Sequence, residues 1–363
     1  MILKNTNKIL LIIQRSNGDV LLSLSLIKAL FENFNQPQID ILVNDDTVQV
    51  AKTMPFINHI YTFSYLKKQA GRYKQEKNLI SSIFRKYDLS INLTSSDRSV
   101  IYAILASKNS ISAVEKNHKK SWWKKYFLSM YYYFDSSRHI LLNNLEPLNL
   151  LNISHKKTQE PIKISAEAHT KVNSMLNKKG IKKYIIFHPS AQYLYKIYPK
   201  HLRNKFLFLL NSLDVPILIT GTNNQIDLNI KNALPSLPNI YDFIGETTLQ
   251  EYIALSKSAL AYIGMDTLNM HIAASQSKRI FAIYGPTNLS MWSPWSNSLK
   301  TGTTRNSPLQ TYGNVTIFQA SFPCVSCGNA GCNDNHGRSE CLHAIKPEKI
   351  FNEVSYWYKN VNI

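Results

Sequence analysis

Short apolar runs and helix-like patterns alternate along the whole chain. The first apolar run, Lys8 to Ile13, precedes a Gly-containing loop and a stretch whose apolar residues recur at helical spacing. Three further runs and a helical stretch continue the alternation: strands at Ile39 to Val43, Ile60 to Phe63 and Asp88 to Leu93, and a helix around Lys77 to Arg85. Strands that alternate with helices are typical of a doubly wound parallel sheet, so we expect an α/β fold.

The second half of the chain repeats this alternation. A helix at Glu167 to Lys179 precedes a new series of elements. These are strands at Tyr184 to Phe187, Pro216 to Thr220, Ile240 to Phe243 and Ala259 to Ile263, and a helix at Leu249 to Ser256. A polar stretch, Asn152 to Glu160, separates the two series, and 363 residues suit two domains. We therefore predict an N-terminal domain at residues 1–165, a second domain at 166–345 and a final helical segment at 346–363.

The stretch from Tyr262 to Trp295 is the most informative one. An apolar run, a turn, a short helix at Met270 to Ser275 and a second apolar run at Arg279 to Tyr284 form one βαβ unit. Ligands of such sheets bind at the carboxyl ends of the strands. Thr267 lies at the start of the helix, where unpaired N–H groups and the helix dipole favour a phosphate. Asp266 either caps the helix or presents its carboxylate to hydroxyl groups.

The residues of this stretch resemble glycosyltransferase family 9, the bacterial heptosyltransferases. The shared pattern consists of Asp266-Thr267, His271, Ala273-Ala274, Gly285-Pro286-Thr287 and Trp292-Ser293-Pro294. One position departs from the pattern, because Leu268 stands where the family usually has Gly. Glycine at that place would permit a positive φ or a close approach of the backbone to a ligand. The departure concerns the phosphate contacts and leaves the expected fold unchanged.

The resemblance implies a GT-B architecture, in which two doubly wound (Rossmann-like) domains face a central cleft and the C-terminal helix returns to the N-terminal domain. It implies an inverting transfer of a heptose from ADP-heptose to the inner core of lipopolysaccharide, on a Kdo or heptose acceptor. The first domain would then bind the acceptor and the second the nucleotide sugar. Two alternatives stay open: a GT-B enzyme with another nucleotide sugar or a protein acceptor (a protein heptosyltransferase), and a non-catalytic binding homologue.

Asp19 follows the first expected strand and is the candidate general base. In the family, the Gly-Asp pair after this strand carries the base, and here the pair is Gly18-Asp19. A carboxylate can accept the proton that an acceptor hydroxyl loses as it attacks the anomeric carbon. On the residues alone, the cap of a helix that begins at Val20 is the better explanation of Asp19, and the resemblance reverses this preference.

The resemblance also implies a set of donor-binding residues in the second domain. Ser190 and Lys196 would contact the diphosphate, Gly245 and Thr247 would lie beside the adenine, and the remaining contacts would come from Asp266, Thr267, Leu268 and His271. Lysine and backbone dipoles would stabilise the leaving diphosphate, so catalysis would require no divalent cation. Two simpler readings stay open: Thr247 or Thr248 is a helix cap with Glu251, and His271 bonds a buried carbonyl.

The net charge of +19 favours anionic partners: nucleic acid, phosphorylated sugar or an anionic membrane. Lysines and aromatic residues are interleaved after Ser110, most densely at Lys119, Lys120, Trp122, Trp123 and Lys124. Such a segment suits a membrane interface, phosphorylated lipid A or core sugars, or single-stranded nucleic acid. It also suits a plain amphipathic helix. Because the family acceptor is membrane-anchored, the resemblance favours a lipid A-core acceptor and membrane role and no nucleic acid.

No run of about 18 apolar residues indicates a spanning helix, and the chain begins without a signal-peptide pattern. We therefore expect a cytoplasmic protein, and the resemblance implies that it is peripheral on the inner face of the inner membrane.

Four cysteines gather near the C terminus, at Cys324, Cys327, Cys332 and Cys341. Their spacing suits a tetrahedral site for a structural zinc or iron ion. Reduced free thiols and disulfides remain the alternatives.

Overall fold

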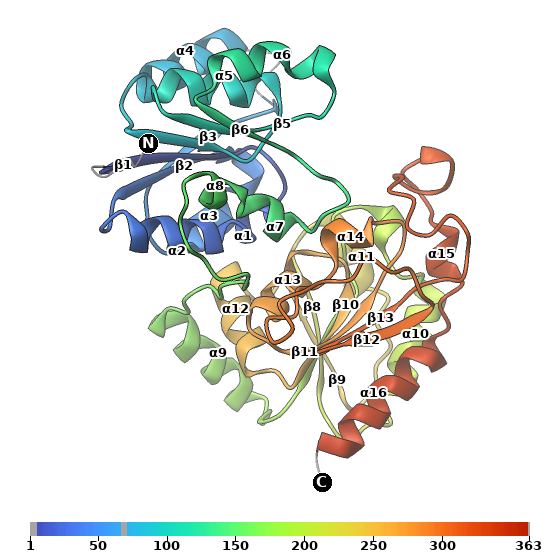
Figure 1. Cartoon of the computed structure of the whole chain (residues 1–363). Helices are drawn as coiled ribbons and strands as arrows, with labels where there is room; N and C mark the ends of the chain where they lie inside the picture. Colours follow the sequence, from blue (N-terminus) through green and yellow to red (C-terminus); the bar gives the residue numbers. More distant parts are fainter. Residues whose placement is uncertain (1–5, 67–70, 362–363) are drawn as a thin grey trace. The chain divides into compact units, whose positions relative to one another are not determined.

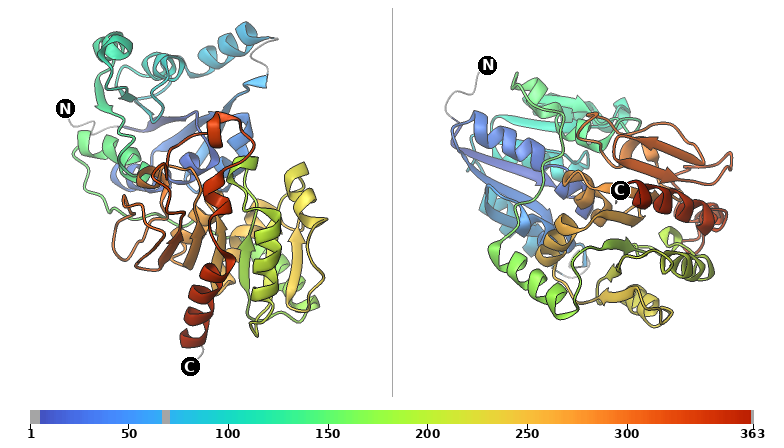
Figure 2. Two further views of the ribbon diagram at one scale, coloured as in Figure 1. Left: turned by 90° about the vertical axis from the view of Figure 1, so that its right-hand side faces the viewer. Right: turned by 90° about the horizontal axis from the view of Figure 1, so that it is seen from below.

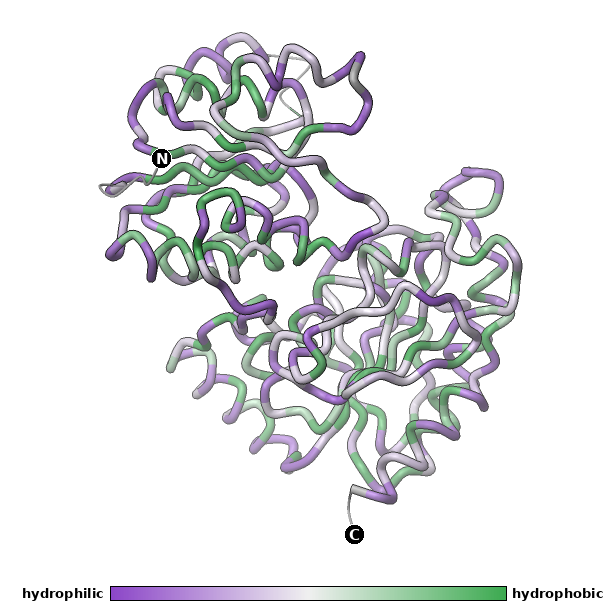
Figure 3. The backbone as a smooth tube through the Cα atoms, in the orientation of Figure 1, coloured by the Kyte–Doolittle hydropathy of each residue, from purple (hydrophilic) through white to green (hydrophobic). Residues whose placement is uncertain are grey.

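The computed structural model describes residues 6–66 and 71–361, and the chain divides into two compact units. Unit 1 spans Met1–Lys163 and unit 2 spans Ile164–Ile363 (Figure 1). We predicted the boundary at residue 165, two residues later. Each unit contains its own sheet, and Figure 3 shows apolar residues concentrated in the central strands of both.

Unit 1 is a parallel sheet with helices on both faces. Its strands are β1 (Lys8–Ile13), β2 (Gln38–Asn44), β3 (Ile57–Phe63), β4 (Leu89–Asn92), β5 (Ser110–Val114) and β6 (Met130–Tyr133), in the order β3-β2-β1-β4-β5-β6. Its helices are α1 (Asn17–Leu21), α2 (Leu24–Asn33), the 3₁₀ turn η1 (Asp45–Thr47), α3 (Val48–Thr53), α4 (Arg72–Ile83), α5 (Asp97–Ala106), α6 (His118–Phe127), α7 (Ile140–Asn144) and α8 (Glu146–Leu150). In Figure 1, α4, α5 and α6 cover one face of the sheet and α2 and α3 the other.

Unit 2 repeats this plan. Its strands are β7 (Ile185–His188), β8 (Ile217–Gly221), β9 (Ile240–Ile244), β10 (Ala261–Met265), β11 (Arg279–Ile283), β12 (Leu309–Tyr312) and β13 (Val315–Phe318), in the order β12-β13-β11-β10-β7-β8-β9. Only the β12–β13 pair of this sheet is antiparallel. Its helices are α9 (Ala166–Lys178), η3 (Leu194–Lys196), α10 (Lys200–Leu210), α11 (Gln225–Lys231), α12 (Leu249–Ser258), α13 (Leu268–Ser275), α14 (Leu289–Trp292), η4 (Cys332–Asp334), α15 (Glu340–His343) and α16 (Pro347–Val361).

The strand order places one switch point in each sheet. The strand order reverses between β1 and β4 in unit 1 and between β7 and β10 in unit 2. The central strand β1 is apolar from Ile9 to Ile13, because these residues are buried between the helices on the two faces of the sheet. Ligands of open α/β sheets bind at the carboxyl ends of the strands beside a switch point, so we expect ligand contacts in the loops after these four strands.

The C-terminal helix α16 belongs to unit 2. It packs against α10, and Figure 2 shows the two helices side by side. Ile350 and Val354 are fully buried in the core of unit 2, and the ring of Trp357 lies 5.6 Å from that of Phe281. The apolar face of α16 is therefore covered within its own unit, and the return of this helix to the first domain stays a prediction.

No helix in residues 6–66 and 71–361 is both long and apolar enough to cross a membrane.

Candidate active-site residues

The loops after β7 and β10 lie close together at the switch point of unit 2. The two strands pair in parallel, with Gly264 opposite His188. A Cβ atom on Gly264 would lie 2.5 Å from the backbone oxygen of His188, closer than real side chains approach. Only glycine permits this approach of the two strands. The close packing brings the residues that follow both strands to one place.

Lys196 and Asp266 form an ion pair across this switch point. The Lys196 Nζ lies 3.0 Å from Asp266 Oδ2, and the Asp266 side chain is only 9% exposed. Burial raises the pKa of Asp266, but the charge of Lys196, the nearby His271 imidazole and hydrogen bonds from Lys196 and Thr287 outweigh that effect, so the net shift of the pKa is downward. Burial alone would lower the pKa of Lys196, yet the Asp266 carboxylate raises it overall. Both groups are therefore charged at neutral pH.

His271 lies one turn into α13 and is buried. Burial lowers its pKa to about 4, against the opposing effect of the Asp266 carboxylate. The imidazole is therefore neutral at physiological pH, with its ring centroid 6.1 Å from that of Trp292. A neutral histidine beside a charged pair can donate or accept a hydrogen bond without adding charge.

Asp266 does not cap α13, which corrects one of the two readings of this residue. The N-cap is Thr267, in an extended conformation, and its side chain makes no capping bond. Leu268 is the first helical residue and is not among the residues with positive φ. The departure from Gly at this position therefore causes no backbone strain. The first turn of α13 keeps unpaired N–H groups, as every helix start does.

Ser190 is tied to a neighbouring buried carboxylate. Its hydroxyl donates to Asp227 Oδ1, and Asp227 Oδ2 also accepts from the Thr222 N–H at 2.5 Å and from the Thr222 hydroxyl at 2.8 Å. Asp227 lies in the first turn of α11 and is 2% exposed. These bonds join the loops after β7 and β8. Sequence reasoning missed Asp227, because only its place three residues after the N-cap Asn224 distinguishes it.

Sequence reasoning also missed the role of His188, which connects several loops of unit 2 through hydrogen bonds. Its Nδ1 lies 3.0 Å from Thr220 Oγ1 and 3.0 Å from Asn269 Nδ2. Burial lowers its pKa to about 4. A neutral His188 therefore links the end of β7, the end of β8 and the start of α13.

The loop after β9 contains both Gly245 and a helix cap. Gly245 has φ +79°, a left-handed conformation that favours glycine, and a Cβ there would also displace the Asn223 side chain. Thr248 is the N-cap of α12 and forms a capping box with Glu251, which confirms the cap interpretation for Thr248. Thr247 precedes the cap and is half-buried.

Asp19 lies at the switch point of unit 1 and is 3% exposed. The helix does not begin at Val20, as the cap interpretation required: α1 begins at Asn17, its N-cap is Ser16, and Asp19 is the third helical residue. Asp19 Oδ2 accepts from the Ser16 N–H at 3.1 Å and from the Ser16 hydroxyl at 2.7 Å, and Oδ1 lies 3.0 Å from Arg15 Nε.

The carboxyl of Asp19 is shifted in the direction that suits a base. Burial raises the pKa of Asp19, and the nearby Arg15 charge and Ser16 bonds offset only part of that rise. A carboxylate whose pKa lies above its usual range has a greater affinity for a proton. The same group therefore completes a helix N-terminus and carries a raised pKa.

The lysine- and aromatic-rich segment forms α6 and the edge strand β6. Trp122, Tyr126 and Phe127 are 61%, 82% and 60% exposed, and Lys119 and Lys120 are exposed beside them. We refer to these five residues as the α6 patch. Trp123 is instead half-buried against the apolar cluster around Val100.

Lys124 does not belong to the α6 patch, contrary to our expectation. Its side chain is fully buried, and Nζ lies 2.8 Å from both Asp97 Oδ1 and Glu115 Oε2 and 2.6 Å from the Ser95 backbone oxygen. Two carboxylates and a carbonyl satisfy the ammonium inside the unit. Lys124 is therefore a structural residue that cannot contact a ligand.

The four cysteines surround one cavity of ≈ 250 Å³ as free thiols. Cys341 is buried, which raises its pKa to about 11, with a smaller contribution from the other three cysteines. In the described part of the chain, however, no three His, Cys, Asp or Glu side chains are arranged to hold a metal ion. A bound zinc or iron ion therefore stays a prediction, which metal analysis of the purified protein would test.

Comparison with known proteins finds relatives over most of the chain. Residues 77–319 match glycosyltransferase family 9 (heptosyltransferase). Lipopolysaccharide heptosyltransferase 3 of Escherichia coli K12 is 28% identical over 300 residues, which cover 78% of this chain and 84% of that protein.

Two solved structures share the fold over nearly the full chain. A glycosyltransferase family 9 protein of Veillonella parvula has a TM-score of 0.73 and 17% identity, covering 97% of each chain. E. coli heptosyltransferase WaaC with ADP has a TM-score of 0.69 and 14% identity, covering 96% of this chain and 99% of that one. Together with the two sheets, these similarities confirm the expected GT-B architecture of two Rossmann-like domains.

Proposed function

The chain belongs to glycosyltransferase family 9, and on that basis we propose that it transfers a heptose from ADP-heptose to a sugar of the lipopolysaccharide inner core. The observation that carries the proposal is the buried Lys196–Asp266 pair at the switch point of unit 2. Support for the donor comes from the family and from the related WaaC structure with ADP. Support for the acceptor comes from the E. coli lipopolysaccharide heptosyltransferase relative.

In the proposed reaction unit 2 holds the donor. Lys196 contacts the diphosphate as a compact cation, together with the N–H groups at the start of α13. Asp266 orients Lys196 and accepts hydrogen bonds from heptose hydroxyls, while neutral His271 lies beside them. Ser190, Gly245 and Thr247 shape the loops around the nucleotide. Of these, Ser190 acts chiefly through its bond to Asp227, which fixes the loop that precedes Lys196.

Unit 1 supplies the base. The Asp19 carboxylate accepts the proton of the acceptor hydroxyl, whose oxygen attacks the anomeric carbon as the bond to the diphosphate breaks and ADP leaves. A single displacement inverts the anomeric configuration. Negative charge that develops on the diphosphate is stabilised by Lys196 and the α13 start. These groups replace a divalent cation, so transfer should continue in the presence of a chelator.

Calorimetric titration with ADP, ADP-heptose, UDP-glucose and GDP-mannose in chelator tests the donor. We expect selective binding of the two adenine nucleotides. Preference for the uridine or guanosine sugar would leave the fold assignment intact and overturn the heptose donor.

We further infer that the α6 patch contacts the anionic membrane that holds the acceptor, which makes the protein peripheral on the cytoplasmic face. Exposed aromatic rings suit headgroup depth, and exposed lysines attract anionic lipid. At the adjoining edge strand, Lys125 Nζ lies 4.8 Å from the Tyr133 ring centroid and donates to its hydroxyl at 2.8 Å. That contact keeps further aromatic surface beside the patch.

Vesicle co-sedimentation tests this surface. Tyr126→Ala should weaken binding to vesicles that contain anionic lipid, and raised salt should weaken it further, because surface charges are screened. Tyr73→Ala is the matched control, since Tyr73 is an 81% exposed tyrosine on α4 of the same unit. Equal effects of the two substitutions, or no binding by the unaltered protein, would contradict the proposal.

A further inference from the structure

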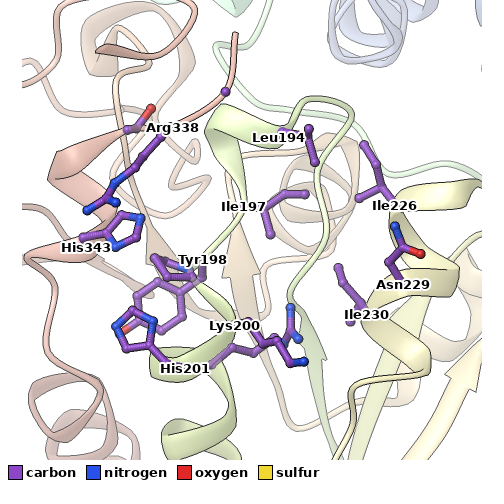
Figure 4. A pocket seen from close by; sticks show the side chains of 14 residues that line it. Leu194, Ile197, Tyr198, Lys200, His201, Ile226, Asn229, Ile230, Arg338 and His343 are labelled. Carbon is purple, nitrogen blue, oxygen red and sulfur yellow. The ribbon is translucent and has the colours of Figure 1, made fainter. Parts of the chain in front are cut away.

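A separate cavity of unit 2 lies next to the turn that carries Lys196. Its volume is ≈ 450 Å³, within the range of about 300–1,000 Å³ that small-molecule sites occupy. It is formed by η3 and the residues after it, the start of α10, one side of α11, and the residues just before and at the end of α15 (Figure 4). Lys196 itself does not line it, so the cavity is distinct from the Lys196–Asp266 site.

One part of the cavity wall is apolar. Figure 4 shows Leu194 and Ile197 on one side, and Ile226 and Ile230 of α11 across from them. Leu194 is an apolar side chain that is 59% exposed. An apolar group that entered the cavity would cover this surface and gain free energy in proportion to the area removed from water.

The other part of the wall is cationic. Lys200, Arg203 and Arg338 line the cavity, with His201 and His343 beside them, and none of the described lining residues is acidic. Arg338 already has a partner, because its Nε lies 2.6 Å from Glu340 Oε1. Lys200 is exposed to solvent at the start of α10. Arg203 differs from both.

Arg203 is a buried cation without an anion. The residue is 3% exposed, its Nε has no hydrogen-bond partner, and its side chain makes no ion pair with any described residue. Burial lowers its pKa to about 10, so the guanidinium remains protonated at neutral pH. Burying a charge without a partner is costly, and two other buried ionisable side chains of this unit, Asp266 and Asp227, do have partners. An anion in the cavity would supply the missing partner.

We propose that this cavity binds an amphipathic oxyanion, whose phosphate or carboxylate pairs with Arg203 and whose apolar body packs between Leu194, Ile197 and α11. The planar guanidinium fork matches the geometry of either oxyanion. Because Leu194 and Ile197 flank Lys196 in the chain, the occupant would contact the turn that holds the donor-site lysine.

Calorimetric titration with hexyl phosphate, inorganic phosphate and hexanol tests both halves of this site. We expect hexyl phosphate to bind, inorganic phosphate to bind at least about tenfold more weakly because it lacks the apolar contacts, and hexanol not to bind. Equal binding of hexanol, or no binding of hexyl phosphate, would overturn the proposal. Equal binding of inorganic phosphate would overturn its apolar half. Displacement of hexyl phosphate by ADP would refute a site separate from the donor.

Two variants locate the site. Arg203→Met should lower the hexyl phosphate affinity at least about tenfold, since a charge-assisted hydrogen bond is lost, while leaving the melting temperature of the ligand-free protein unchanged or higher. A lowered melting temperature with unchanged affinity would assign Arg203 a purely structural role.

Asn229→Glu provides an independent check, because Asn229 is an exposed lining residue of α11 and the new carboxylate would repel an anion. Asn232→Glu is the matched control: Asn232 is exposed just after the same helix and does not line the cavity. Weakening by Asn229→Glu alone supports the site, and equal effects of both would overturn it. These measurements need no donor, so they can fail without affecting the proposed heptose transfer.

Discussion

Unit 1 and unit 2 have the same strand order around their switch points, yet the pKa values of the two carboxyl groups placed there are shifted in opposite directions. Asp19 in unit 1 has a raised pKa because burial outweighs Arg15 and Ser16. Asp266 in unit 2 has a lowered pKa because Lys196, His271 and Thr287 outweigh burial. The shared scaffold therefore determines where a carboxylate lies, and its immediate neighbours determine what it does.

The difference matches the two tasks of the proposed reaction. A base gains from a raised pKa because it must take up a proton, whereas a group that orients a cation and sugar hydroxyls must stay ionised. Asp19 fits the role of the base, and Asp266 fits the role of the orienting group.

The largest effect is expected for Asp19→Asn. Heptose transfer should fall by about 10²–10⁴-fold, because an amide cannot accept the proton, while ADP affinity in calorimetry should stay unchanged. Asp46→Asn is the control, since Asp46 is an exposed carboxylate of the same unit. Near-normal transfer by Asp19→Asn would remove the base assignment.

Lys196→Ala changes a residue of unit 2, and we expect it to weaken nucleotide binding. ADP affinity should fall about 10–100-fold, the equivalent of one charge-assisted hydrogen bond. Lys183→Ala, an exposed lysine of unit 2, should leave it unchanged. An unaltered ADP titration for Lys196→Ala would place the diphosphate elsewhere.

The pH dependence of stability should separate the two carboxylates directly. The pKa of Asp266 lies below its ordinary value of 3.8, so its charge stabilises the fold above about pH 4 and that contribution is lost as the pH falls through the lowered pKa. Asp266→Asn should therefore lower the melting temperature at pH 7 and have less effect in acid.

Ionisation of Asp19 changes the stability of the fold in the opposite direction to ionisation of Asp266. Its raised pKa means that ionisation costs stability above that pKa and costs nothing below about pH 4. Asp19→Asn should leave the melting temperature at pH 7 unchanged or raise it. If thermal unfolding at pH 7 gave both variants the same decrease, the contrast between the two carboxylates would be refuted.

The smallest effect is expected for Thr248→Ala. Loss of the α12 cap should cost about 1 kcal/mol of unfolding free energy, measured by denaturant titration. ADP affinity should not change, because Thr248 bonds to Glu251 of its own helix. A marked loss of ADP binding would show that this threonine contacts the nucleotide.

The sequence patterns predicted most of the two sheets, because parallel strands buried on both faces are continuous apolar runs. The same patterns failed to predict the surroundings of a side chain when its interaction partners come from distant segments of the chain. Lys124 looks like one more exposed lysine of a basic segment, but Glu115 and Asp97 from outside α6 surround it. Asp266 precedes a helix as a cap would, and only the folding of the β7 loop brings Lys196 to it.

The same limit applies to α16 and Arg203. The amphipathic pattern of α16 predicts a covered face without specifying α10 as the cover. The spacing of Arg203 in α10 likewise gives no sign that the charge is buried without a partner. In both cases the deciding contact joins elements far apart in the chain, and local patterns do not contain that information.

The most direct test of the account is to incubate the purified protein with ADP-heptose and inner-core lipopolysaccharide that lacks its terminal heptose, and to follow ADP release and acceptor mass. We expect ADP release that depends on the acceptor and a mass gain of one heptose. ADP-heptose that binds at the Lys196–Asp266 site without turnover on any inner-core acceptor would contradict the proposed transfer.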